Sequence, residues 1–156
     1  MSKQILGWRE WVSLPDLEIA SIKAKVDTGA RTSALHAFRV EAFSRGGSEW
    51  IRFALHPLQN RDDCVLEVEA PVKDRRLVRD SGGHSEMRYV IETRIQIGDR
   101  CVTSEITLTD RDTMKFRMLL GRTTLKQGYI VDPSRSYLSG GAAGEAGPAT
   151  QETPDP

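Results

Sequence analysis

Several features that would assign a protein of this size to a class are absent from the 156-residue chain. Two cysteines, Cys64 and Cys101, are too few for a disulfide framework, and we interpret each as a reduced thiol in a strand. The 22 basic and 22 acidic residues balance, so no overall charge attracts nucleic acid or an anionic membrane. No apolar run is long enough to span a membrane, and residues 1–15 lack the pattern of a signal peptide. We therefore expect a cytoplasmic protein that binds neither nucleic acid nor membranes.

Helical periodicity is also scarce, and alternation of apolar and polar residues takes its place. This alternation predicts short strands, and turn residues separate them, as in a closed or folded antiparallel barrel. The predicted strands cover residues 19–26, 50–55, 64–68, 87–97 and 100–108, and only residues 123–127 have a firm helical pattern. The length fits one domain, residues 1–138. Residues 139–156 are rich in Gly, Ala and Pro without a large apolar residue, and we predict that they form a disordered tail.

The most informative motif places an acid, a hydroxyl and a glycine at Asp27, Thr28 and Gly29, directly after the strand predicted over residues 19–26. A carboxylate at the end of a strand is held rigidly, and a glycine beside it allows other backbone to approach closely. An aspartic peptidase needs this arrangement. The triplet alone is also typical of an ordinary turn that ends a strand, because Asp and Gly are common turn residues.

A second motif, Leu119-Leu120-Gly121-Arg122, strengthens the first. Residues 118–120 are typical of a buried strand, and the residues up to Gly128 suit one short helix. The two motifs together resemble the retropepsin family, the single-lobe aspartic proteases of retroviruses. Gly82 and Gly83, which precede the strand predicted over residues 87–97, are similar to the glycine-tipped flap hairpin that closes over substrate in that family. The resemblance implies an all-β fold, a retropepsin-like closed antiparallel β-barrel with one short C-terminal helix and a flap hairpin.

Residues 25–37, taken with residues 108–111 and 118–122, resemble a narrower branch of retropepsin-like proteins in bacteria and archaea. These proteins are labelled ATP-dependent zinc proteases and are associated with ATP-grasp amino-acid ligases, which implies a partner in an ATP-grasp ligase pathway. The label itself finds little support, because the three histidines and two cysteines form no His-Glu-x-x-His or Cys-x-x-Cys motif. The chain also lacks a glycine-rich loop that would cradle phosphates. We predict no metal ligands and no cofactor.

Peptide hydrolysis by carboxylates needs two of them around one water, sharing a proton. This chain has one convincing triplet, because Asp80-Ser81-Gly82 lies in a charged context and is better interpreted as a flap tip or turn. The second acid is therefore expected from Asp27 of a second copy, across the two-fold axis of a homodimer. In such a dimer the resemblance implies that Thr28 links the two active-site loops and that Gly29 admits the substrate backbone.

The chain departs from the viral pattern at Arg31. Viral enzymes have an aspartate there, which pairs with the arginine after the downstream glycine, here Arg122, and contacts the substrate main chain. Two arginines cannot form this pair, so either another acid approaches or Arg31 turns toward the cleft, where it suits a carboxylate. A solvated surface position is the other interpretation of Arg31. The candidate acids are Glu92, Asp110 and Asp112. The expected substrate contacts are Ala30, Arg31, Gly82, Gly83 and Arg122.

Basic residues surround the predicted flap, namely Lys73, Arg75, Arg76, Arg79 and Arg88. Such a run is usually a solvated face, but over an active site it favours acidic peptides. We therefore predict an aspartic endopeptidase that acts on peptide or protein substrates, with acidic or glutamate-tailed chains as our hypothesis. The alternatives are a catalytically weak or inactive peptide-binding regulator of an ATP-grasp ligase system, and a metal-dependent peptidase.

Overall fold

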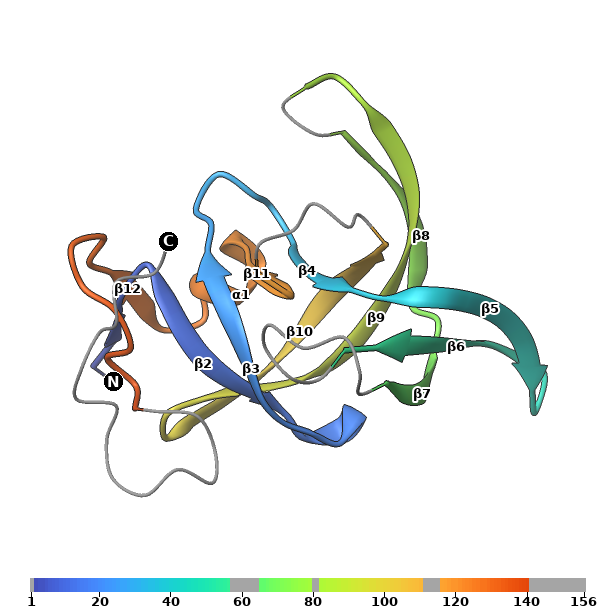
Figure 1. Cartoon of the computed structure of the whole chain (residues 1–156), viewed down its shortest axis with the longest axis horizontal. Helices are drawn as coiled ribbons and strands as arrows, with labels where there is room; N and C mark the ends of the chain where they lie inside the picture. Colours follow the sequence, from blue (N-terminus) through green and yellow to red (C-terminus); the bar gives the residue numbers. More distant parts are fainter. Residues whose placement is uncertain (1, 57–64, 80–81, 111–115, 141–156) are drawn as a thin grey trace.

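The computed structural model describes residues 2–56, 65–79, 82–110 and 116–140 (Figure 1). Strands dominate these residues, and each of the two helices is a single short turn. The strands are β1 (Gln4–Leu6), β2 (Arg9–Leu14), β3 (Ile19–Val26), β4 (Ser33–His36), β5 (Phe38–Arg45), β6 (Ser48–Leu55), β7 (Leu66–Pro71), β8 (Asp74–Arg79), β9 (Ser85–Ile97), β10 (Arg100–Thr109), β11 (Met118–Leu120) and β12 (Tyr129–Val131). The helices are the 3₁₀ turn η1 (Pro15–Leu17) and α1 (Arg122–Leu125). Neither helix of the described part is long and apolar enough to cross a membrane.

Six strands close into a barrel in the order β10-β4-β11-β3-β2-β9, and β9 pairs back with β10 (Figure 1). The alternation predicted from the sequence is seen along β9, where Ile91, Ile95 and Ile97 are fully buried while Glu92 and Arg94 are exposed. A period of two places every second side chain in the barrel interior. The expected closed β-barrel with one short C-terminal helix and a flap hairpin, formed by β8 and β9, is confirmed.

The barrel is mixed, which corrects the expectation of a purely antiparallel one. Strand β11 runs parallel to β3 and antiparallel to β4, and β4 runs parallel to β10. The cause is that β3 and β4 run in opposite directions and β11 inserts between them, so β11 can be antiparallel to only one of them. The apolar pattern of a strand predicts which face is buried and carries no information on the direction of its neighbours.

Two smaller sheets flank the barrel. Strands β5, β6 and β7 form an antiparallel sheet, and their inward residues, such as Phe53 and Val68, join the barrel core. Strands β1 and β12 form a parallel two-stranded ribbon in which Gln4 lies opposite Tyr129 and Leu6 lies opposite Val131. We call this pair of strands the terminal ribbon. Its strand β12 follows α1 closely in the chain.

The segment after β12 returns across β2 and is fastened there. The backbone N–H of Trp8 donates to the Arg135 carbonyl at 2.8 Å. The fully buried Glu10 carboxylate accepts the N–H groups of Gly7, Leu138 and Ser139 at 2.7 to 3.0 Å. These bonds satisfy a buried charge with three donors. Residues 141–156, most of the predicted tail, lie outside the described residues, as does Cys64. Cys101 is exposed in β10 with a free thiol.

Candidate active site

The loop of residues 27–32, which we call the Asp27 loop, joins β3 to β4 and holds the predicted catalytic carboxylate. The Asp27 N–H donates to the Leu120 carbonyl at 2.9 Å, which ties the end of β3 to the end of β11. The Gly29 N–H donates to Oδ1 of Asp27 at 3.0 Å and orients the carboxylate. A Cβ at Gly29 would lie 3.3 Å from that same oxygen, so any larger residue at this position would crowd the Asp27 carboxylate. Asp27 is half-buried, and Thr28 and Gly29 are exposed.

Helix α1 holds the other side of the loop. The N–H groups of Arg122 and Thr123 donate to the carbonyls of Ala30 and Arg31, both at 2.9 Å. The Arg122 guanidinium donates through Nη1 to the Thr28 carbonyl at 3.1 Å. A backbone carbonyl oxygen therefore accepts the hydrogen bond from the Arg122 side chain. In the viral pattern an aspartate side chain pairs with this arginine. No sequence motif signals such an acceptor, because every residue has a carbonyl.

The three acids considered as partners of the arginines do not fill that role within the described part of the chain. Glu92 lies 3.4 Å from Nζ of Lys73, and neither Glu92 nor Asp110 bonds Arg31 or Arg122 there. Asp112 lies outside the described residues, as do Asp80 and Ser81. Arg31 is exposed and is among the residues that line the cleft described next.

A cleft of about 390 Å³ lies between the Asp27 loop and the flap. Among the described residues, its lining contains five arginines and no aspartate or glutamate. The lining residues are Gly29, Ala30, Arg31, Thr32, Ala34, Arg76, Leu77, Val78, Arg79, Arg88, Thr107, Leu119 and Arg122. Four of the predicted site residues, Gly29, Ala30, Arg31 and Arg122, are thus brought together on one wall.

The remaining predicted residues lie near the cleft without lining it in a single copy of the chain. Asp27 and Thr28 precede Gly29 in the same loop, and Gly82 and Gly83 are exposed in the turn of the flap. Gly83 has a φ of +85°, a conformation that favours glycine. Sequence reasoning missed Thr107 and Ala34, whose strands reach the cleft only because β4 and β10 are neighbours in the barrel.

Most basic residues of the flap are already paired with carboxylates. Arg76 holds both oxygens of Glu105 at 2.7 and 3.2 Å and bonds Asp74 at 2.8 Å. These hydrogen bonds raise the pKa of Arg76 and lower the pKa of Glu105. Arg88 bonds Glu86 at 2.6 Å, Arg75 pairs with Glu49, and Lys73 pairs with Glu92.

Three cleft arginines, Arg31, Arg79 and Arg122, have no carboxylate partner among the described residues. Among the described residues, the guanidinium of Arg79 bonds the Ser85 hydroxyl, at 3.4 Å, and that of Arg122 bonds the Thr28 carbonyl. An unneutralised guanidinium presents a planar fork of donors to an incoming carboxylate. The cleft therefore has a positive wall available to an acidic ligand.

Large apolar side chains are exposed in two cross-strand pairs near this site. Leu77 and Met87 face each other across the flap and are 61% and 64% exposed. Ile5 and Ile130 face each other across the terminal ribbon and are 52% and 51% exposed. Exposed apolar pairs of this kind are typical of surfaces that contact another molecule.

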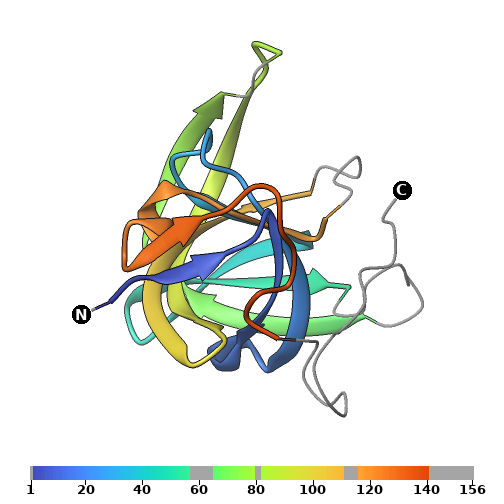
Figure 2. The same ribbon diagram turned by 90° about the vertical axis from the view of Figure 1, so that its left-hand side faces the viewer.

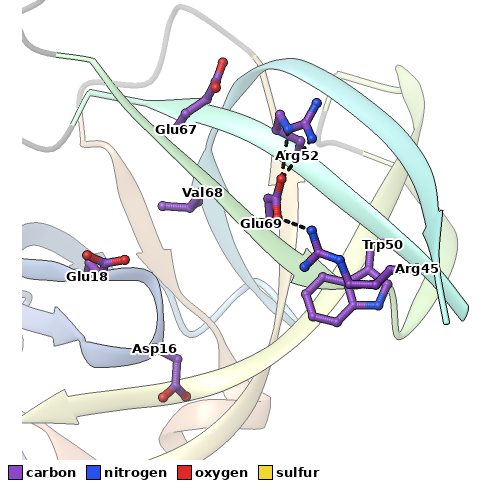
Figure 3. A pocket seen from close by; sticks show the side chains of 8 residues that line it. All are labelled: Asp16, Glu18, Arg45, Trp50, Arg52, Glu67, Val68 and Glu69. Atoms are coloured by element: carbon purple, nitrogen blue, oxygen red, sulfur yellow. Dashed lines mark hydrogen bonds and ion pairs between the residues drawn. The ribbon is translucent and has the colours of Figure 1, made fainter.

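A second hollow, of about 350 Å³, lies between η1 and the three-stranded sheet (Figure 3). We call it the η1 hollow, and it contains none of the predicted site residues. Its two arginines, Arg45 and Arg52, both bond Glu69, at 2.6 and 3.0 Å, and Arg45 also lies 4.4 Å from the centre of the Trp50 ring. These bonds lower the pKa of Glu69. Among the described residues, no group of three or more His, Cys, Asp and Glu side chains is arranged to hold a metal ion, here or in the cleft.

Comparison with known proteins agrees with this geometry. A family model described as RimB-like, retropepsin-like aspartic endopeptidase RimB, matches residues 5–141. A protein of unknown function from Legionella pneumophila has a similar solved structure, with a TM-score of 0.74 and 25% identity over 88% of this chain and 99% of its own. The retropepsin resemblance inferred from the two motifs is thereby confirmed.

Three curated relatives carry the name probable alpha-L-glutamate ligase. The relative from Shewanella pealeana is 47% identical over 139 residues, which are 89% of this chain and 30% of the relative. The relative from Parasynechococcus marenigrum is 46% identical over 88% of this chain and 30% of its own length. The relative from Desulfotalea psychrophila is 41% identical over 94% of this chain and 32% of its own. The chain thus spans about 30% of the length of the curated relatives it matches.

Proposed function

Because the chain belongs to the RimB-like family of retropepsin-like aspartic endopeptidases, we propose that it hydrolyses peptide bonds in acidic polypeptides. The reaction uses a water held between two Asp27 carboxylates, one from each copy of a homodimer. The observation that carries the proposal is the cleft, where the Asp27 loop meets five arginines and, among the described residues, no carboxylate in the lining.

The chemistry follows from two carboxyl groups that share one proton, since like charges so close cannot both ionise. The ionised carboxylate takes a proton from water while the water oxygen bonds to the peptide carbon, and the protonated carboxyl gives its proton to the carbonyl oxygen. The resulting diol collapses when the first carboxyl protonates the leaving nitrogen. The carbon–nitrogen bond breaks, a diol proton returns to the second carboxylate, and the pair regains its starting state.

The homodimer is supported by what one copy lacks and by what it exposes. One chain supplies one Asp27, and the described residues that line the cleft of one copy include no second acid. In the view of Figure 2 the flap is uppermost, with the β3–β4 loop below it and β1 and β12 lower still. The Leu77–Met87 pair lies on the flap and the Ile5–Ile130 pair lies on the terminal ribbon, and we propose that the second copy covers both.

An acidic substrate is supported by the charge of the cleft. Arg31, Arg79 and Arg122 offer donors that no carboxylate of the described residues occupies, and their field raises the encounter rate of anionic chains. The relatives point in the same direction, because in them the matching region is part of a longer protein named for ligating glutamate. We infer that their ligase activity belongs to the rest of those chains and that glutamate-tailed polypeptides are the substrates of this one.

The names of the relatives also favour one alternative. A peptidase-like region joined to a ligase in one chain could bind the acidic product without cutting it, and so regulate the ligase. This second candidate uses the same cleft and the same arginines. It differs from the first in that Asp27 has no chemical role.

Replacement of the carboxylate tests the choice directly. Cleavage sites in a mixture of peptides, with glutamate-tailed peptides included, are mapped by mass spectrometry for wild type, Asp27→Asn and the control Asp99→Asn, with and without a chelator. We expect Asp27→Asn to lower the cleavage rate by about a thousandfold or more, because the amide cannot act as the base. Asp99 lies in an exposed turn, so the same change there should have no effect.

Each other outcome has a defined meaning. Binding of glutamate-tailed peptides by wild type and Asp27→Asn alike, without cleavage by either, would establish the regulatory alternative. Activity that disappears with the chelator and survives in Asp27→Asn would assign the reaction to a metal.

The dimer is tested by a charge in the terminal ribbon. We expect Ile130→Glu to raise the dissociation constant of the dimer by about tenfold or more, because it buries a carboxylate against the second copy. Sedimentation equilibrium measures this constant. Val40→Glu is the matched control, since Val40 is an exposed apolar residue of β5, away from the ribbon. Equal dimer affinity in wild type and Ile130→Glu would refute the proposed surface.

A further inference from the structure

Three buried hydroxyls form a chain behind the Asp27 loop. Ser33 begins β4, Thr124 lies in α1 and Ser104 lies in β10, and all three are buried. Oγ of Ser33 is 2.6 Å from Oγ1 of Thr124, which in turn is 2.7 Å from Oγ of Ser104. These hydrogen bonds connect three elements that are distant in the sequence.

The chain begins at the backbone of the second motif. The N–H of Gly121 donates to Oγ of Ser33 at 2.9 Å. A hydroxyl that accepts this bond still has its own proton to donate, so Ser33 can donate to Thr124 and Thr124 to Ser104. Hydrogen bonds in series polarise one another and strengthen the whole. The Thr107 hydroxyl adds a bond to the Ser33 carbonyl at 3.3 Å.

Gly121 connects the hydroxyl chain to the Asp27 loop. Its neighbour Leu120 accepts the Asp27 N–H, and its neighbour Arg122 donates to the Ala30 carbonyl. The backbones are in close contact, because a Cβ at Gly121 would lie 2.6 Å from the carbonyl carbon of Thr32. The position of residues 120–122 therefore determines the position of the Asp27 loop, and the hydroxyl chain holds those residues from behind.

We propose that Ser33, Thr124 and Ser104 are positioning residues that hold the Asp27 loop in the geometry required for catalysis. Stability accounts for Ser33, which satisfies the buried Gly121 N–H, but it does not call for Thr124 and Ser104, because apolar side chains of similar size would fill their space without buried polar groups. Two carboxylates that share one water and one proton do require a loop that holds them in a precise relative position. The role in catalysis rests on the proposed peptidase function, whereas the rigidity of the loop does not.

The test uses the full chain with three single replacements. Thr124→Val removes the central hydroxyl at nearly constant volume, and Thr124→Ser retains it. Thr93→Val makes the same change at a buried hydroxyl of β9 that lies outside the chain of three. Amide hydrogen exchange of residues 27–32 is measured by mass spectrometry, and kcat and KM are measured on a glutamate-tailed peptide.

For Thr124→Val we expect exchange in residues 27–32 to accelerate by about tenfold or more and kcat to fall by about tenfold or more, with little change in KM. Thr124→Ser and Thr93→Val should resemble wild type in both measurements. The proposal is overturned if Thr124→Val leaves exchange in the loop unchanged. It is also overturned if Thr93→Val accelerates that exchange equally, or if Thr124→Ser fails to restore it. A wild type without peptidase activity would refute the proposed function, while the exchange data would still decide whether the hydroxyls position the loop.

Discussion

The cleft and the η1 hollow are both lined by arginines, and they differ in what those arginines contact. In the hollow, Arg45 and Arg52 converge on Glu69, so their charge is used within the protein (Figure 3). In the cleft, Arg31 and Arg79 have no carboxylate partner among the described residues. The number of arginines in a depression therefore says little about whether it binds an anion. An anion is attracted only when some of these arginines have no carboxylate partner within the protein.

The flap contains both kinds of arginine within one hairpin. Arg76 and Arg88 line the cleft, but Glu105 and Glu86 occupy their donors. Arg76 joins the flap to β10, so we assign to it a structural role. Arg79, at the end of β8, has no carboxylate partner among the described residues, and we propose that it contacts substrate. The flap cluster that the sequence predicts as one acidic-substrate site is therefore divided between the two roles.

The cleft and the η1 hollow should differ most in their effect on substrate preference, and neutralising Arg31 and Arg79 of the cleft tests this. We expect Arg31→Gln with Arg79→Gln to lower kcat/KM for glutamate-tailed peptides by about tenfold for each arginine, because each loses a charge-assisted bond to substrate. Uncharged peptides should be cut at an unchanged rate. The wild-type preference for acidic peptides should also weaken as salt is added, since exposed charges are screened.

The matched control is Arg45→Gln with Arg52→Gln, which removes the same charge from the η1 hollow. This pair should keep the wild-type preference for acidic peptides. A loss of preference in both double variants would mean that net charge, and not the cleft, selects the substrate.

A smaller effect is expected from acid on the η1 hollow. Hydrogen bonds from Arg45 and Arg52 lower the pKa of Glu69 below its ordinary value of 4.5. The unfolded chain therefore binds this proton more readily than the folded one, and the stabilisation is complete above pH 4.5. It is lost as the pH falls through the lower pKa of the folded state.

Glu69→Gln should consequently flatten the fall in melting temperature below pH 4.5, by a small amount because the three side chains are partly exposed. Thermal unfolding of wild type and variant at pH 7 and at pH 3.5 measures this. Cleavage at neutral pH should be the same for both proteins. Equal acid sensitivity of the two melting temperatures would show that the hollow contributes nothing through Glu69.

Much of the fold could be predicted from the sequence because local patterns specify it. The alternation along β3 and β9 identified strands with one apolar face, and Asp27 was placed correctly at the end of the first of them. The turn at Gly82 and Gly83 and the short helix after Gly121 were recognised from residue type. These features depend on neighbours within a few positions in the chain.

Other features of the site could not be predicted, because they depend on residues that the fold brings together. The acceptor of Arg122 is a backbone carbonyl 94 positions away, and the hydroxyl of Ser33 meets that of Thr124 across 91 positions. The pairing of Arg76 with Glu105 likewise follows from the contact between the flap and β10. No pattern in the sequence indicates such pairs, since the chain has many serines, arginines and glutamates and the sequence does not distinguish which of them will be in contact.

Local sequence patterns predicted several of the strands, among them β3, β9 and β10, together with the carboxylate at the end of β3, its occurrence once per chain, and the glycines near it. Residue chemistry and spacing suffice for these, because they act over short distances along the chain. The tertiary structure alone decided that β11 enters between β3 and β4, which arginines keep an unpaired charge, and how the Asp27 loop is held from behind. The physical reason is that strand order and register choose the neighbours of each side chain, and those neighbours determine whether a charge or a hydroxyl is already bonded or free to act.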